Sequence, residues 1–293
     1  MMRSLFSAIS GLKNHQTMMD TVGNNIANVN TTAFKSARVT FQDIISQTIR
    51  GATAPNQNVG GRNPMQIGLG VQAGTIDTII TQGNLQSTNK QTDVAIQGDG
   101  YFVLSDNAAT PNYSFTRDGN LDLGVPVNAG DPRPLIQSAT GLHVKGYVPP
   151  QAANSADSTT APTTDVTIPS QVNNVAVTGF NIDSNGIVNL TMADGTTQTG
   201  YAQLAVATFP NPGGLNRQGS NLFLPSANSG QASYNGAAVN GRGQIQAGFL
   251  EMSNVDLAQQ FTNMIIAQRG FQANSRVITA TDEVLQDLVN LKR

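Results

Sequence analysis

The sequence contains no cysteine, only two histidines and few charged residues. The absence of cysteine excludes disulfide bonds, thiolate metal sites and cysteine nucleophiles. Charged residues make up 12% of the 293 residues, about half of the ~25% that is usual for soluble domains. A formal net charge of -2 gives little repulsion between copies, and the 16 Lys and Arg residues form no basic patch. The composition therefore favours self-association over nucleic-acid binding.

Long apolar runs are also missing. No run approaches the ~18 residues that a membrane span requires. Ser4, Ser7 and Ser10 interrupt the apolar start of the chain, so we expect a retained helix there and no cleaved signal peptide. His15 and His143 fall in different predicted elements, which leaves no histidine cluster for a metal or a catalytic triad. We expect no enzymatic activity, no cofactor, no metal site and no small-molecule substrate.

Apolar residues with helical spacing occupy the N-terminal stretch. They are Leu5, Ile9, Leu12, Met19, Val22, Ile26 and Val29. Steps of three, four and seven place these side chains on one face of a helix. The pattern stops at residues 28–32, where asparagine can adopt the left-handed conformation that ends helices.

A second long helix is predicted from about Asn254 to Leu291. Its repeat comprises Leu257, Phe261, Met264, Gln268, Phe271, Ser275, Ile278 and Leu285, with Leu288 beside it. Ser253 and Asp256 precede it with the spacing of a capping box. Both predicted helices carry many Asn and Gln side chains, which neighbouring copies can bury with hydrogen bonds and without desolvating charges. Packing within one monomer is the alternative to assembly.

Short runs with a period of two fill the middle of the chain, separated by turn dipeptides such as Asp99-Gly100 and Asn185-Gly186. This pattern is typical of antiparallel hairpins. The predicted strands cover residues 71–80, 93–97, 101–105, 113–117, 143–148, 187–192 and 203–209. The small, polar, proline-bearing stretch 149–164 is expected to be a linker. The fold class is therefore α+β, with long terminal helices and a mainly antiparallel β middle.

Three domains are expected. Residues 1–32 and 254–293 would form a terminal helical domain, and residues 33–148 and 201–253 a β-rich middle domain. Residues 149–200, which include the linker, would form a small inserted β domain.

Several segments closely resemble the shared signature of flagellar rod and hook proteins. The first is the N-terminal stretch Ser4–Lys35, especially Gly23–Lys35, which includes Asn24, Asn25, Asn28, Asn30 and Phe34. Others are Thr81–Leu85, Asp93–Phe102, Phe115–Gly119, Leu250–Ala258 with Ser253, Asn254 and Asp256, and Ala267–Arg276 with Gln268 and Arg269. Together they extend over most of the chain outside residues 149–200.

The resemblance implies a subunit that polymerises with many copies of itself. The terminal helices would form a coiled-coil-like inner domain that lines a channel. The residues expected to contact other subunits are Leu5, Ile9, Leu12, Val22, Ile26, Leu257, Phe261, Met264, Phe271, Ile278, Leu285 and Leu288. The implied partners are rod proteins, hook–filament junction proteins, the hook cap and the flagellar type III export apparatus. The implied location is the extracellular hook on the basal body.

Within the family, Val144–Tyr147, Asp194–Thr197 and Ala205–Leu215 resemble the hook version. We therefore expect a hook subunit, whose curved hollow tube acts as a flexible universal joint between rod and filament. The alternative is a subunit of the distal rod, a rigid drive shaft. Hook subunits usually carry a larger inserted domain than residues 149–200 provide, which keeps the rod alternative open.

Overall fold

A computed structural model describes residues 2–55, 60–106, 112–125, 132–150 and 157–291. The chain divides into two compact units. The helical unit comprises Met1–Val29, Ser36–Ile79 and Val255–Arg293, and the β unit comprises Asn30–Lys35 and Ile80–Asn254. Neither of the described helices has the length and apolar character needed to cross a membrane.

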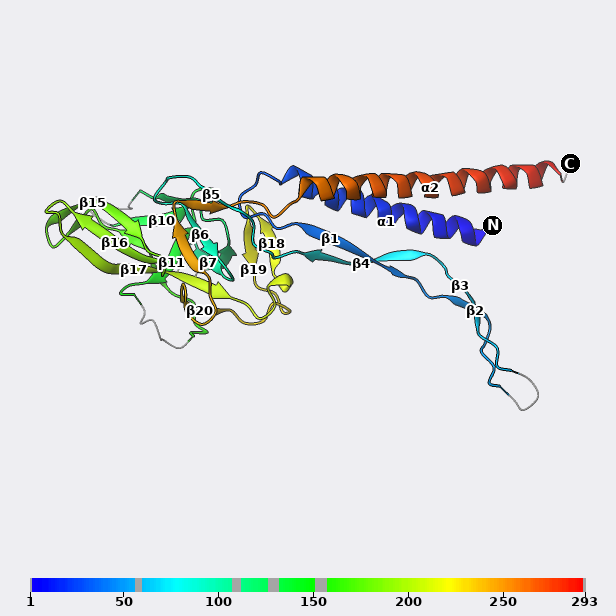
Figure 1. The fold of residues 1–293 in the computed structure, drawn as a ribbon, viewed down its shortest axis with the longest axis horizontal. Helices are drawn as coiled ribbons and strands as arrows, with labels where there is room; N and C mark the ends of the chain where they lie inside the picture. Colours follow the sequence, from blue (N-terminus) through cyan, green and yellow to red (C-terminus); the bar gives the residue numbers. More distant parts are fainter. Residues whose placement is uncertain (1, 56–59, 107–111, 126–131, 151–156, 292–293) are drawn as a thin grey trace. The chain divides into compact units, whose positions relative to one another are not determined.

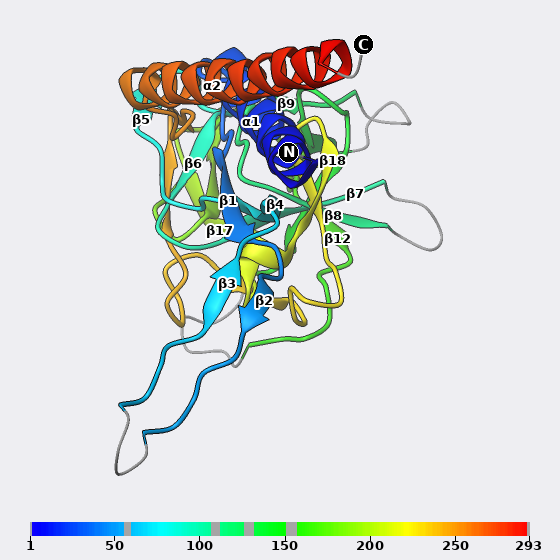
Figure 2. The same cartoon turned by 90° about the vertical axis from the view of Figure 1, so that its right-hand side faces the viewer.

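The helical unit contains both terminal helices, α1 (Met2–Ala27) and α2 (Leu257–Asn290), which confirms the two predicted helices. Between them in sequence, β1 (Ala37–Asp43) pairs with β4 (Val71–Thr78), and β2 (Gln47–Arg50) pairs with β3 (Met65–Ile67). Both pairs are antiparallel and two-stranded. Figure 2 shows α1 between α2 and the ribbon formed by β1 and β4.

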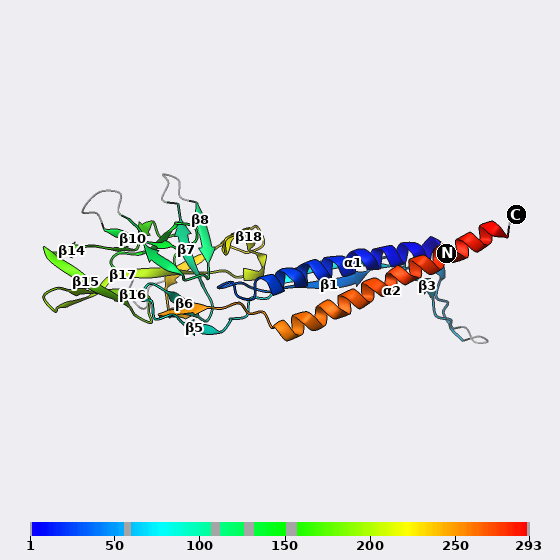
Figure 3. The same cartoon turned by 90° about the horizontal axis from the view of Figure 1, so that it is seen from above.

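Small residues bring α1 and α2 close together. A Cβ atom at Gly11 would lie 2.5 Å from Asn274 Nδ2, and one at Gly270 would lie 2.4 Å from His15 Cε1. Near the other end of α1, Asn25 Nδ2 donates to Gln260 Oε1 at 3.2 Å. Residues late in α1 therefore lie opposite residues early in α2, and the helices run antiparallel (Figure 3).

Asp256 sets the start of α2. Its carboxylate accepts hydrogen bonds from the backbone N–H groups of Ala258 at 2.9 Å and Gln259 at 3.3 Å. These are two of the donors that the first helical turn leaves unpaired. The helix begins at Leu257, three residues later than expected, because the side chain that caps it is that of Asp256 and not that of Ser253.

The β unit is built from short strands. They are β5 (Leu85–Ser87), β6 (Val94–Gln97), β7 (Tyr101–Ser105), β8 (Tyr113–Thr116), β9 (Leu121–Leu123), β10 (Arg133–Gln137), β11 (His143–Tyr147), β12 (Thr164–Asp165), β13 (Thr167–Ile168), β14 (Gln171–Val172), β15 (Val175–Ile182), β16 (Ile187–Met192), β17 (Thr197–Thr208), β18 (Asn216–Gly219), β19 (Leu222–Leu224), β20 (Ser233–Gly236), β21 (Gln244–Ala247) and β22 (Phe249–Glu251), with a short 3-10 helix at Pro212–Gly214. Strands β7 and β16 have the bounds predicted from the sequence.

One antiparallel sheet dominates this unit (Figure 1). Its main path runs β14-β15-β16-β17-β11-β7-β8-β19-β18, while β21 pairs with β6 and β22 pairs with β5. The long strand β17 pairs with β16 near its start and with β7, β11 and β20 further along. Hydrogen-bonded pairing is thus continuous from residues 175–192 into the rest of the sheet.

The core of the β unit is continuous as well. Phe102 and Leu104, from β7, are fully buried in the same apolar cluster as Val188 and Leu190, from β16. The sequence predicts a separate inserted domain at residues 149–200, but described apolar side chains of this stretch help to fill the common core. Likewise, residues 36–79, expected in the β-rich domain, group with the helices.

Candidate assembly surface and buried anchor

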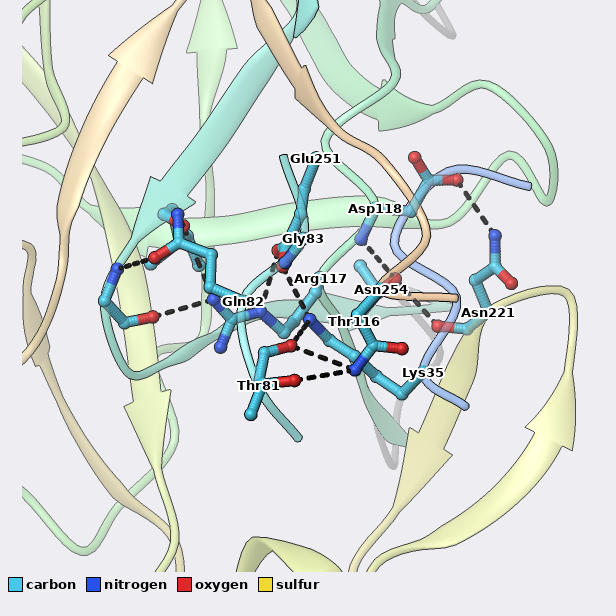
Figure 4. Close-up of polar contacts among 12 residues, drawn as sticks. Lys35, Thr81, Gln82, Gly83, Thr116, Arg117, Asp118, Asn221, Glu251 and Asn254 are labelled. Carbon is cyan, nitrogen blue, oxygen red and sulfur yellow. Dashed lines mark hydrogen bonds and ion pairs between the residues drawn. The ribbon is translucent and has the colours of Figure 1, made fainter. Parts of the chain in front are cut away.

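The family-like segments that lie in the β unit meet around one buried carboxylate, that of Glu251 at the end of β22 (Figure 4). Lys35 Nζ donates to Glu251 Oε1 at 2.5 Å, and Arg117 Nε donates to Glu251 Oε2 at 2.9 Å. The backbone N–H of Gly83 donates to Oε1 at 2.9 Å. Four segments that are distant in sequence are thus joined by one side chain. We call Lys35, Arg117 and Glu251 the buried anchor.

The electrostatics of the anchor follow from its burial. All three side chains are at most 2% exposed. Burial lowers the pKa of Lys35, and the nearby Glu251 carboxylate opposes that shift. Burial also raises the pKa of Tyr101, whose ring lies 5.9 Å from the Arg117 guanidinium, to about 12. Each cation also bonds to a backbone carbonyl, since Lys35 Nζ donates to Thr81 O and Arg117 Nη2 donates to Gly98 O.

Backbone and amide groups extend the anchor along the two segments that flank the helices in sequence. The N–H of Ala33 donates to the carbonyl of Glu251 at 2.7 Å, and the N–H of Asn254 donates to the carbonyl of Phe34 at 3.3 Å. The Asn254 side chain also donates to the hydroxyl of Thr81 at 3.0 Å. The segment that follows α1 is therefore bonded directly to the segment that precedes α2.

A second set of family-like residues acts inside the helical unit. The Asn25 side chain is buried and forms a two-way bond with the backbone of Ala37, donating at 2.8 Å and accepting at 2.9 Å. This bond holds the start of β1 against α1. Asn14 Nδ2 similarly donates to the carbonyl of Val71, in β4, at 2.7 Å. At the end of α1, Asn28 Nδ2 donates to the Asn24 carbonyl at 2.9 Å.

The other signature residues lie at or near surfaces. Asn30, Gln268 and Arg269 are exposed, while Phe34 and Ser253 are half-buried. The Arg217 guanidinium lies 5.3 Å from the centre of the Phe34 ring. Asn30 and Phe34 belong to the β unit, and Gln268 and Arg269 lie on α2.

Most of the predicted contact residues are accessible on the helical unit. Ile9, Leu257, Phe261, Phe271 and Leu285 are exposed, Leu5, Leu12, Ile26, Met264 and Ile278 are half-buried, Val22 is buried at 5% exposure, and the side chain of Leu288 lies outside the described residues. Val22 therefore packs within its own unit. The accessible set is unusual, because soluble proteins rarely leave large apolar side chains exposed in continuous groups.

The exposed apolar residues of α2 form two stripes. Leu257, Phe261 and Ile265 follow one another at steps of four, and Ile266, Val277, Val284 and Leu291 follow at steps of eleven and seven. At about 100° per residue these stripes lie on either side of the face that packs against α1. We call them the apolar flanks. Helix α2 therefore exposes apolar side chains on both sides of the face that packs against α1.

Sequence reasoning missed two features. One is the anchor, because ion pairing between residues as distant as Lys35 and Glu251 leaves no local pattern. The other is strands β1 to β3 of the ribbon, whereas its fourth strand, β4, matches the strand predicted at residues 71–80. The ribbon carries exposed apolar residues such as Phe41, Ile49 and Ile76. The alternation at residues 39–41 could have indicated β1. A two-stranded ribbon is only marginally stable in water, so its apolar residues add to the candidate assembly surface.

Among the described residues, no group of three or more His, Cys, Asp and Glu side chains could hold a metal ion.

The chain matches three family models. They are "Flagella basal body rod protein" at residues 5–35, "Flagellar hook protein FlgE/F/G D1 domain" at residues 95–190, and "Flagellar basal body rod FlgEFG protein C-terminal" at residues 246–291. These matches include the buried anchor residues Lys35, Arg117 and Glu251.

Curated relatives match the chain along its whole length. The flagellar basal-body rod protein FlgG of Bacillus subtilis is 47% identical over 294 residues, which is 100% of both chains. The flagellar hook protein FlgE of Borreliella burgdorferi is 30% identical over 451 residues, again covering 100% of both. Among solved structures, the Helicobacter pylori flagellar hook protein FlgE2 aligns with 66% of this chain and 47% of that chain, at 15% identity and a TM-score of 0.23.

These relatives are structural proteins of the flagellum, and their alignments extend over the whole chain, including the helices, the anchor and the sheet. The 47% identity to a rod protein and the 30% identity to a hook protein both extend over the full length of this chain. The chain belongs to the family of flagellar rod and hook proteins.

Proposed function

We propose that this chain is the subunit of the distal rod, the rigid shaft of the flagellar basal body. The observation that supports this most strongly is length. Alignment with the rod protein FlgG takes 294 positions for a chain of 293 residues, whereas alignment with the hook protein FlgE takes 451. Hook relatives thus carry long segments that this chain lacks. The expectation of a hook subunit is not favoured, and the rod alternative replaces it.

The apolar flanks support polymerisation as the mode of action. Burying apolar area contributes about 25 cal/mol per Å², so the exposed side chains of α2 and the ribbon favour contacts with further copies. In this proposal the terminal helices form a coiled-coil-like inner layer, and the accessible contact residues pack between subunits. A contact that does not close on itself, repeated by each copy, gives a helical filament.

The buried anchor suits a shaft that carries torque. Each helix is joined to the β unit by a single stretch of chain, and the two stretches are bonded to each other through Ala33, Lys35 and Glu251. Load entering through either helix is then shared by both connections. Buried charge pairs tolerate little displacement, because separating them leaves uncompensated charge in a low-dielectric interior.

The proposed partners follow from the proposed place in the flagellum. They are many copies of this chain, adjoining rod and hook proteins, and the export apparatus that delivers subunits to the growing end. The hook remains the second candidate, since a hook protein is 30% identical over the whole chain.

Two measurements test the proposal. Electron microscopy of the purified full-length protein should show straight tubes, and a chain reduced to residues 33–253 should form none. Expression in a Bacillus subtilis strain without FlgG should restore rod assembly, and expression in a strain without its hook protein should not. Curved tubes together with rescue of the hook-deficient strain would show that the hook assignment is correct.

A further inference from the structure

We propose that, in the polymer, the outer face of α1 in one copy packs against the last turns of α2 in a second copy. Phe6, Ile9 and Lys13 form the α1 face, and Asp282, Leu285 and Val289 form the α2 face. This inference rests on the proposed polymerisation and specifies one of its contacts.

The α2 face lies where α2 has little intramolecular cover. The contacts of Gly11 with Asn274 and of His15 with Gly270 fix the antiparallel register of the two helices. If the same register is extended to Met2, the first described residue of α1, then Met2 lies opposite Glu283. The following residues of α2, from Val284 to Leu291, then have no described α1 residue opposite them. Val289 is 69% exposed there, and Leu285 is exposed too.

The residues of the α2 face point in similar directions. Asp282, Leu285 and Val289 are separated by three and four residues, which returns them to one side of a helix. Asp282 is exposed, and among the described residues its carboxylate accepts a hydrogen bond only from Gln286 Nε2, on the same helix, at 3.3 Å. The face therefore combines two apolar side chains with one acid at the end nearer the body of the helix.

The α1 face lies on the opposite side of α1 from its own partner helix. Ala8, Gly11 and Val22 are buried on the inner side. Phe6 is 60% exposed, Ile9 is 46% exposed, and Lys13 is exposed as well. These three outer residues are separated by three and four positions, so they too share one side of the helix.

The two faces match when the helices are antiparallel. Val289 then lies opposite Phe6, Leu285 opposite Ile9, and Asp282 opposite Lys13. This pairing is possible because both faces extend over seven residues in steps of three and four. Two apolar pairs and one acid–base pair form together. Neither Lys13 nor Asp282 makes an ion pair with any residue that the structure describes, so both charges are available.

The register of this contact differs from that within one copy by about ten residues. At 1.5 Å per residue, neighbouring copies would be offset by roughly 15 Å along the helix axis. The two faces belong to different surfaces of the chain, so each copy can use both at once. Such a contact is heterologous and extends without closing, which suits a filament and does not suit a closed dimer.

Cysteine cross-linking tests the contact directly, because the chain contains no cysteine of its own. Phe6→Cys and Val289→Cys are combined in one full-length chain, and polymers are treated with a short thiol-to-thiol cross-linker. We expect a ladder of covalent multimers from polymers and only monomers from dilute protein. The control combines Phe6→Cys with Phe261→Cys, which is exposed on the early part of α2. A polymer that gives no ladder, or an equal ladder from the control, overturns the proposal.

Charge reversal provides a second test that does not depend on the cysteine variants. Lys13→Glu and Asp282→Lys should each raise the lowest protein concentration at which polymers form by roughly threefold to fivefold. The double variant should return it to within about twofold of the unchanged chain. Additive losses in the double variant would contradict the pairing. If the unchanged chain forms no polymer, it is the proposed function that fails.

Discussion

The two units of the molecule place their large apolar side chains in opposite ways. In the β unit, Phe102, Leu104 and Phe115 are fully buried. In the helical unit, the face between α1 and α2 consists largely of small and polar residues, and side chains such as Phe6 and Phe261 are exposed. The β unit therefore has a complete core of its own, whereas the helical unit leaves large apolar side chains exposed.

The two units also differ in the kind of polar side chain that they bury. The β unit buries full charges, those of Lys35, Arg117 and Glu251, while the helical unit buries the neutral amides of Asn14 and Asn25. Breaking a buried ion pair costs far more than rearranging an amide hydrogen bond. We therefore expect the β unit to be the more rigid of the two, and the helical unit to rearrange its polar contacts at lower cost.

The largest expected difference between the two units comes from replacing one phenylalanine in each of them with alanine. Phe102→Ala should lower the free energy of unfolding of the β unit by about 3–5 kcal/mol, because it opens a cavity in a closed core. Phe261→Ala, at a side chain that is 51% exposed, should leave the monomer within about 0.5 kcal/mol and weaken polymerisation. Urea denaturation and a sedimentation assay measure the two effects. Equal losses of monomer stability would contradict the contrast between the units.

The anchor is expected to give the next largest effect. Glu251→Gln keeps the shape of the side chain but leaves two buried cations without a counter-charge, and should lower the free energy of unfolding by about 3 kcal/mol. Asp194→Asn, at an exposed turn where the Asp194 carboxylate accepts hydrogen bonds from Thr196, is the matched control and should not move the unfolding midpoint. Thermal unfolding of the monomer is the measurement.

The long elements of this fold could be predicted from local pattern. Both terminal helices, and strands such as β7 and β16, follow from spacing that their own residues carry. The start of α2 was misplaced, because Ser253 and Asp256 both satisfy the capping pattern and only the structure shows which one accepts the backbone bonds. The resemblance predicts the family, yet it favours the hook, because three segments resemble the hook version. The short stretch 149–200 is the sequence feature that points to the rod, in agreement with the alignment lengths.

The anchor could not be predicted in the same way. Lys35 and Glu251 both lie in family-like segments, but their pairing depends on strand β22 meeting the chain that follows α1. The exposure of the apolar flanks could not be predicted either. A helical repeat of leucine and phenylalanine is the same whether it forms an internal core or a contact between subunits. In the structure, the close contacts at Gly11 and Gly270 and the bond from Asn25 to Gln260 show which face is used within the monomer.

Those glycines allow a sharper test of the helical unit. Gly270→Ala would place a methyl group against the His15 ring, where the Cβ would lie 2.4 Å from Cε1, and should destabilise the helix pair by about 1–3 kcal/mol. Gly23→Ala, with nothing within 4 Å of its Cβ, should stabilise α1 by up to about 1 kcal/mol. The temperature at which half of the helicity is lost, measured by circular dichroism, should fall for Gly270→Ala and rise for Gly23→Ala. A loss in both variants would mean that close packing at Gly270 is not the cause.

The smallest effect concerns the start of α2, where the structure assigns the cap to Asp256. Asp256→Ala should cost about 1 kcal/mol of helix stability, because the N–H groups of Ala258 and Gln259 lose their acceptor. Asp256→Asn keeps an acceptor oxygen in place and should retain most of that stability, although it removes a charge. Amide hydrogen exchange at residues 258 and 259 distinguishes the two, with faster exchange in the alanine variant alone. Equal exchange in both variants would indicate that the charge of Asp256, acting on the helix dipole, matters more than its hydrogen bonds.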